Sequence, residues 1–148
     1  MARKITIDQP RIPAELAIAN FQDVFYMEEP YLHSCEIKDC EIANESIDKI
    51  EFAQVVFKHV KFSEVAFKFS DLSNVVFENC DLSNADFMGA NLHRVVFKEC
   101  RMIGINLADA NFSHVSFHDC NLNLSSFSYS SLKQTAFYQC LMRGADFF

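Results

Sequence analysis

The stretch FSEVAFKFSDLSNVVFENCDLSNADFMGANL, residues 62–92, decides the fold through the spacing of its large apolar residues. They stand at every fifth position: Phe62, Phe67, Leu72, Phe77, Leu82, Phe87 and Leu92. An α-helix repeats about every 3.6 residues and a β-strand every 2, so neither element explains a period of five. The spacing predicts a unit in which five residues make one short extended segment and one corner.

The same period extends over most of the chain. A large apolar residue stands at every fifth position from Leu32 to Phe147 without a polar interruption. Two positions before each of them lies a smaller residue, usually Val, Ala, Cys or Ser. Two such positions in a short extended segment would face one core. We therefore predict an all-β solenoid over residues 32–148, preceded by an N-terminal cap or irregular first coil over residues 1–31.

A second period, of twenty residues, indicates how many corners close one coil. Phenylalanines recur at this interval from Phe57 to Phe137, and cysteines recur from Cys80 to Cys140. Identical residues every twenty positions predict four pentapeptides per coil, with like side chains stacked in adjacent coils about 4.8 Å apart. The chain then has about six coils and a four-sided cross-section.

The pattern breaks near the N-terminus. Glu45 is a charged residue at a small inward position, and burying a lone carboxylate is costly. We expect a local bulge there, or a first coil that is open to solvent. Before Leu32 the five-residue register slips, so residues 14–31 form either an irregular first coil or a capping helix over PAELAIANFQDVF, residues 13–25.

The repeats resemble a known family. ADFMGANLHR (residues 85–94) and ADANFSHVSF (residues 108–117) look like tandem copies of A-(D/N)-L-x-x, the motif of pentapeptide-repeat proteins. The resemblance covers residues 32–147 and implies a right-handed quadrilateral parallel β-helix. It also implies a protein-interaction role, and more distantly it includes the Qnr-like branch, whose DNA-mimicking members bind type II topoisomerases.

Composition limits the chemistry that the chain could perform. The six cysteines follow no secretory signal, so we expect reduced thiols and a cytoplasmic protein. No apolar run is long enough to predict a membrane span. The sequence contains no catalytic, phosphate-binding or metal-binding motif, and the cysteine column predicts core packing. We expect no enzyme activity, no cofactor and no bound metal.

Charge and exposed apolar residues indicate where a protein partner would bind. The net charge is −7, and residues 23–51 hold nine acidic residues against two lysines, which argues against direct nucleic-acid binding. The outward positions before the phenylalanine column include three valines. We predict a partner surface that combines these valines with acidic residues of the first coil: Val56, Val76, Val96, Glu28, Glu29, Glu36, Asp39 and Glu41.

The C-terminal sequence RGADFF leaves apolar side chains in the last repeat. We expect end-to-end homodimerisation through Met142, Phe147 and Phe148, because an open apolar end favours association. The alternative is a longer protein in which further coils follow.

Two functions are consistent with these features. The first is a non-enzymatic interaction module, a rigid rod that binds a protein partner. The second is a Qnr-like DNA mimic that binds DNA gyrase or topoisomerase IV and protects it from quinolones. The overall negative charge favours the second function, whereas the clustering of acids at one end and the absence of an interrupting loop argue against it.

Overall fold

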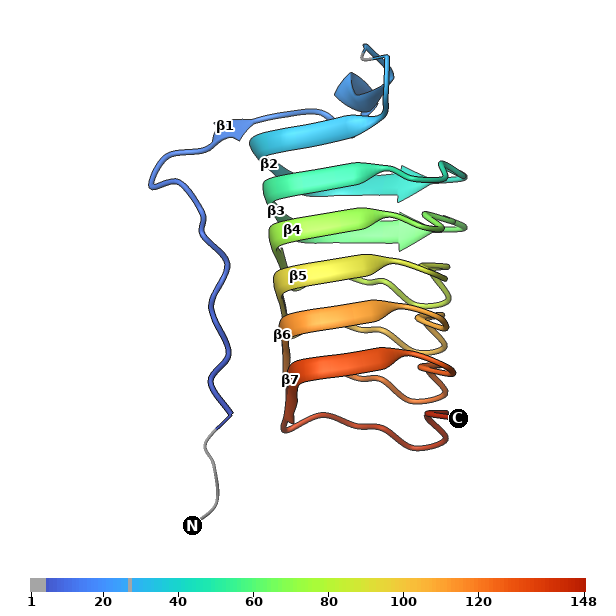
Figure 1. The fold of residues 1–148 in the computed structure, drawn as a ribbon. Helices are drawn as coiled ribbons and strands as arrows, with labels where there is room; N and C mark the ends of the chain where they lie inside the picture. The colour runs from blue at the N-terminus through green and yellow to red at the C-terminus, as the bar shows by residue number, and fades with distance from the viewer. Residues whose placement is uncertain (1–4, 27) are drawn as a thin grey trace.

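The computed structural model describes residues 5–26 and 28–148 and shows a parallel β-solenoid (Figure 1). One seven-stranded sheet contains the strands in chain order from β1 to β7, each paired in parallel with the next. The strands are β1 (Ala17–Ile18), β2 (Tyr31–Ala43), β3 (Glu51–Ser63), β4 (Asp71–Glu78), β5 (Asn91–Lys98), β6 (Asn111–His118) and β7 (Ser131–Tyr138).

The pairing register confirms the predicted period of twenty. Phe57 pairs with Phe77, Phe77 with Phe97, and Phe97 with Phe117, so each coil stacks in register on the one before it. Six coils follow one another from residue 31 to residue 148. Isolated bridges such as Asp86–Asn106 join the remaining sides of adjacent coils, which extends the pairing around the rod.

Four corners per coil arise from one backbone feature. A residue with φ between 47° and 72° recurs at every fifth position along most of the solenoid, as at Asn74, Asn79, Asn84 and Gly89 in the third coil. This left-handed conformation turns the chain after each short extended segment. The five-residue period of the sequence is therefore the distance from one corner to the next.

The core is a stack of large side chains along the rod axis. The rings of Phe77 and Phe97 lie 4.9 Å apart and those of Phe97 and Phe117 lie 4.8 Å apart, nearly parallel in both pairs. These separations match the spacing of the coils, so each phenylalanine packs between identical neighbours. Phe57, Phe77 and Phe117 have no measurable exposure.

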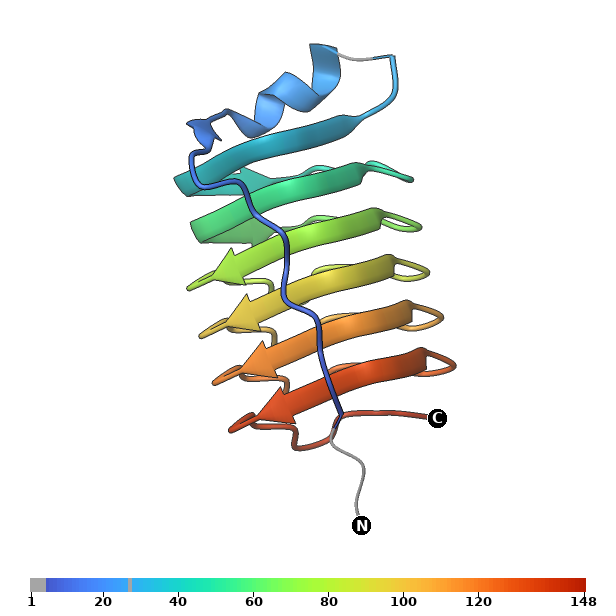
Figure 2. The same ribbon diagram turned by 60° about the vertical axis from the view of Figure 1, so that its left-hand side comes forward.

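The N-terminal end of this core is covered by residues 14–26. Strand β1 pairs with β2, and the 3₁₀ helix η1 (Phe21–Tyr26) follows it across the end of the first coil (Figures 1 and 2). Phe21 and Val24 are buried, and the Phe21 ring lies 5.9 Å from that of Phe67. Glu45 is half-buried beside this cover, with its Oε1 atom 3.5 Å from Gln22 Nε2.

The extreme N-terminal part has an arrangement that the sequence analysis did not anticipate. Residues 5–13, called here the arm, run along the outside of the rod and cross its coils (Figure 2). The arm begins near the C-terminal coils and leads to β1 at the opposite end, so it spans most of the solenoid.

Candidate interaction surfaces

The predicted valine stripe forms one column on the outside of the strands. Val56, Val76 and Val96 pair with one another in β3, β4 and β5, and the column begins with Glu36 and continues with Ser116. Val56 and Val76 are half-buried, whereas Val96 is only 2% exposed although it lies outside the core cluster. The middle of the column is therefore covered from outside.

The arm is hydrogen-bonded to the coils on either side of Val96. The Asp8 backbone N–H donates to His114 Nδ1 at 2.9 Å, and the Arg11 N–H donates to Asn74 Oδ1 at 2.9 Å. These acceptors stand at the corner two residues before the valine column. Val96 lies between the two hydrogen-bonded levels and is therefore not a free docking residue in this conformation.

The predicted acidic residues gather at the N-terminal end of the rod. Glu28, Glu29, Asp39 and Glu41 are exposed, and Glu36 is half-buried at the head of the valine column. Glu41 Oε2 lies 4.0 Å from Lys61 Nζ and accepts a hydrogen bond from Ser63 Oγ at 3.3 Å. The acids therefore surround the first coil, while the valines occupy the next three.

A groove that sequence reasoning missed runs along the neighbouring side of the rod. It has a volume of about 540 Å³ and an apolar floor that includes Leu72, Leu92 and Phe112. One wall is an amide ladder in which Asn91 Nδ2 donates to Asp71 Oδ1 at 3.1 Å and Asn111 Nδ2 donates to Asn91 Oδ1 at 3.0 Å. The twenty-residue recurrence of Asp and Asn at these positions could have indicated the ladder.

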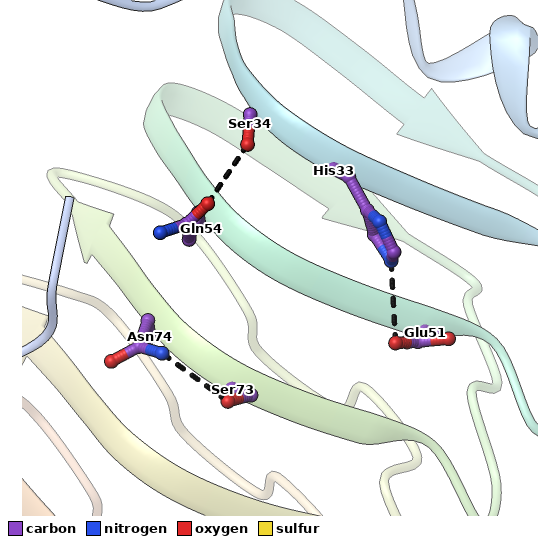
Figure 3. A network of polar contacts seen from close by, with 6 residues as sticks. All are labelled: His33, Ser34, Glu51, Gln54, Ser73 and Asn74. Carbon is purple, nitrogen blue, oxygen red and sulfur yellow. Dashed lines mark hydrogen bonds and ion pairs between the residues drawn. The ribbon is translucent and has the colours of Figure 1, made fainter. Parts of the chain in front are cut away.

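The polar residues near this groove are paired with one another. In Figure 3, His33 Nε2 lies 3.2 Å from Glu51 Oε1, and Ser34 Oγ donates to Gln54 Oε1 at 2.9 Å. In the coil below, Asn74 Nδ2 donates to Ser73 Oγ at 3.4 Å. These contacts hold the side chains of successive coils in fixed orientations.

The cysteine column lies along the core. The thiols of Cys80, Cys100 and Cys120 each donate to a backbone carbonyl of the preceding coil, at 3.4 to 3.5 Å. Contacts with the thiols of Cys120 and Cys80, together with burial, raise the pKa of Cys100. Burial, with a smaller contribution from Asp23, raises the pKa of Cys35 to about 11. Hydrogen bonding with Cys100 instead lowers the pKa of Cys80 and of Cys120. A protonated thiol is a poor nucleophile and a poor metal ligand, so the raised pKa of Cys100 and of Cys35 favours a packing role for these two residues.

The described part of the chain contains no group of three or more His, Cys, Asp or Glu residues arranged to hold a metal ion. Its helical residues include no segment long and apolar enough to cross a membrane. The histidines lie on the outside of the solenoid, where His114 meets the arm and His118 lies 2.9 Å from Ser116 Oγ.

The last two coils carry most of the exposed large apolar side chains in the described part of the chain. Among the residues that the structure describes, seven of the twelve exposed large hydrophobic residues fall in the last 25 positions: Leu124, Tyr129, Leu132, Tyr138, Leu141, Phe147 and Phe148. Phe147 stacks on Phe127 at 5.0 Å but remains 45% exposed, Phe148 is 93% exposed, and Met142 is half-buried. Strand β7 pairs only with β6, so one edge of this coil faces outward.

A six-coil parallel solenoid with a corner at every fifth residue defines the chain as a pentapeptide-repeat protein. The family model described as pentapeptide repeat region matches residues 31–100 and 90–148, so the chain belongs to this family. No curated protein matches the chain significantly.

Two solved structures are similar to the chain. HetL, described as a pentapeptide repeat protein involved in heterocyst differentiation regulation from the cyanobacterium Nostoc sp. strain PCC 7120, is 14% identical with a TM-score of 0.52. That match covers 88% of this chain and 70% of HetL. The second is a trypsin-treated variant of QnrB1, a plasmid-mediated fluoroquinolone resistance protein, which is 22% identical with a TM-score of 0.48. That match covers 78% of this chain and 69% of the QnrB1 chain.

Proposed function

We propose that the protein is a non-enzymatic interaction module that presents a rigid β-solenoid to a protein partner. The observation that carries the proposal is the concentration of exposed large apolar side chains on the last coils, because exposed apolar side chains that gather in one region often mark an interaction site. The continuous stack of core rings gives this surface a rigid support. The reduced thiols favour a cytoplasmic location.

The test compares the unaltered protein with a variant of this surface. Leu141 and Tyr129 are 59% and 83% exposed, so the double variant Leu141→Asp, Tyr129→Asp should fold normally. The unaltered protein is first used to capture a partner from cytosol, and the binding is confirmed with the purified partner. We expect the variant to lose this binding. The matched control is Ile18→Asp, an equally exposed apolar position at the other end. Equal binding by all three proteins would contradict the proposed location.

A second copy of the chain is the first partner that we propose for the C-terminal end. The last coil has an unpaired edge and carries both Arg143 and Asp146, so two copies can meet there without strong charge repulsion. A two-fold arrangement would place Phe147 and Phe148 of each copy against the other.

The alternative function is a DNA mimic that binds DNA gyrase or topoisomerase IV and protects it from quinolones. The exposed carboxylates of Glu28, Glu29, Asp39 and Glu41 are the groups that such a mimic would use, although they gather at one end of the rod. A gyrase supercoiling assay with and without a quinolone separates the two functions. Protection that is lost when these four residues are changed to Gln or Asn would establish the mimic, whereas no effect at micromolar protein would eliminate it.

A further inference from the structure

We propose that the outer face of the solenoid beneath the arm is a binding site for polyproline-type peptide segments, and that the chain's own arm occupies it here. This inference rests on the proposed interaction role and names one partner class for it. The arm sequence, ITIDQPRIP, contains Pro10 and Pro13 with two residues between them. Proline fixes the backbone in the range that polyproline II requires.

The exposure of the arm has the period of a polyproline II helix. Ile7, Pro10 and Pro13 are half-buried at intervals of three, Ile12 beside Pro13 is half-buried as well, and Asp8, Gln9 and Arg11 are exposed. A polyproline II helix has three residues per turn, so every third side chain faces the same way. One apolar edge of the arm therefore faces the solenoid, and its polar residues face solvent.

The rise of such a helix also fits the spacing of the coils. Asp8 and Arg11 are three residues apart, and their acceptors His114 and Asn74 are two coils apart. Three residues of polyproline II rise about 9.3 Å. Two coil spacings amount to about 9.6 Å. A segment of this conformation thus keeps its N–H groups in register with side chains of every second coil.

The acceptors on the solenoid are oriented by their own neighbours. Asn74 Oδ1 also accepts from Arg94 Nε at 2.8 Å, and the Asn74 amide donates to Ser73. Gln54 Oε1 accepts from Ser34, which leaves Gln54 Nε2 to donate to the Arg11 carbonyl at 3.3 Å. A site whose polar groups are already oriented loses less entropy when a ligand binds.

The His114 ring is positioned in the same way. It lies edge-on against His93, with ring centres 5.9 Å apart, and its Nε2 atom is 3.9 Å from Asp8 Oδ2. The contact between Asp8 N–H and His114 Nδ1 requires that nitrogen to carry no proton. The site therefore offers an N–H acceptor at two levels and an apolar surface with Val96 between them.

The experiment uses the full chain with a weakened arm. Asp8→Pro and Arg11→Pro together remove both N–H donors while preserving the polyproline conformation. The probe is a fluorescent synthetic peptide with the sequence of residues 5–16, ITIDQPRIPAEL. We expect it to bind this variant at least about tenfold more tightly than the unaltered chain, because the competing arm closes less often.

The matched control is Gln9→Pro, since the Gln9 backbone N–H makes no hydrogen bond among the described residues. It should leave peptide affinity at the unaltered level. A peptide with Ala in place of Pro10 and Pro13 should bind more weakly. Amide NMR should place the peptide by shifts at Asn74, Val96 and His114.

Three results would overturn the inference. They are equal affinity for all chains, peptide-induced shifts confined to other coils, and an arm that stays docked in the double variant. Should the double variant fail to fold, Arg11→Pro alone gives the same comparison. The peptide experiment can fail while the C-terminal coil still captures a partner. That result would reject the peptide site and leave the proposed interaction function unaffected.

Discussion

At the scale of single residues, the corners explain an unusual composition. The chain has only three glycines, yet twenty non-glycine residues of its described part adopt positive φ. Each such residue costs about 1–2 kcal/mol relative to ordinary conformations. The backbone hydrogen bonds of the corners offset this cost, as where the Glu99 N–H donates to the His118 carbonyl at 2.8 Å.

This strain predicts that a glycine at an exposed corner stabilises the protein. Glu99 has φ of 51° and is exposed, so Glu99→Gly relieves the strain and retains the backbone hydrogen bond. We expect a gain of about 0.5–1 kcal/mol in urea unfolding, after the larger unfolded-state entropy of glycine is subtracted. Lys98→Gly, one residue earlier in β5, should instead lose about 0.5–1 kcal/mol. Equal effects at both positions would refute a specific corner strain.

Two histidines predict a loss of stability in mild acid. Burial lowers the pKa of His118, with a smaller contribution from Lys98, and burial also lowers the pKa of His93. The unfolded chain has a histidine pKa of about 6.5, so it takes up protons before the folded chain does as the pH falls. Stability should be constant above this pKa and should decline below it.

The measurement is the urea midpoint between pH 7.5 and pH 5.5. The decline should be smaller in the double variant His93→Gln, His118→Gln. His59→Gln serves as the control, because His59 is an exposed corner residue. An unchanged pH dependence in the double variant would show that other groups are responsible.

At the scale of the elements, the aromatic stack binds each strand to the next. Phe97 is 3% exposed and contacts Phe77 above and Phe117 below. We expect Phe97→Ala to reduce the unfolding free energy by about 3–5 kcal/mol, because the in-register neighbours cannot collapse into the cavity.

Phe69→Ala is the matched control for this prediction, because the Phe69 side chain is 47% exposed and lies over Gly89. It should cost about 1 kcal/mol or less. Chemical denaturation of both variants gives the comparison, and similar costs would mean that the central stack is not the main source of stability.

The elements also show how far the sequence determines this structure. Spacing alone predicts the coils, because every fifth side chain must enter one core and a shift by one residue would expose the whole set. The spacing puts Val96 at an outward position, and nothing in the spacing indicates that this position is buried. The arm carries no repeat, and its docking depends on Asn74 and His114, which are far away in the sequence.

At the scale of the whole molecule, the two ends of the rod differ. Residues 14–26 cover the N-terminal end, where Phe21 and Val24 are buried. At the other end, Phe147 and Phe148 remain exposed beside the outer edge of the last coil. Stacked side chains and an unpaired edge favour association with a similar surface.

The last prediction therefore concerns association of the C-terminal coils. Light scattering of the purified chain at high concentration should give twice its monomer mass of 17.0 kDa. Phe148→Asp together with Leu141→Asp should give a monomer, because each would place a carboxylate in the apolar contact without disturbing the buried core. Ile18→Asp, at the opposite end, should remain dimeric. A monomer in the unaltered chain would refute this association and leave the exposed phenylalanines to a different partner. A dimer that survives the C-terminal changes but not Ile18→Asp would assign the contact to the opposite end of the rod.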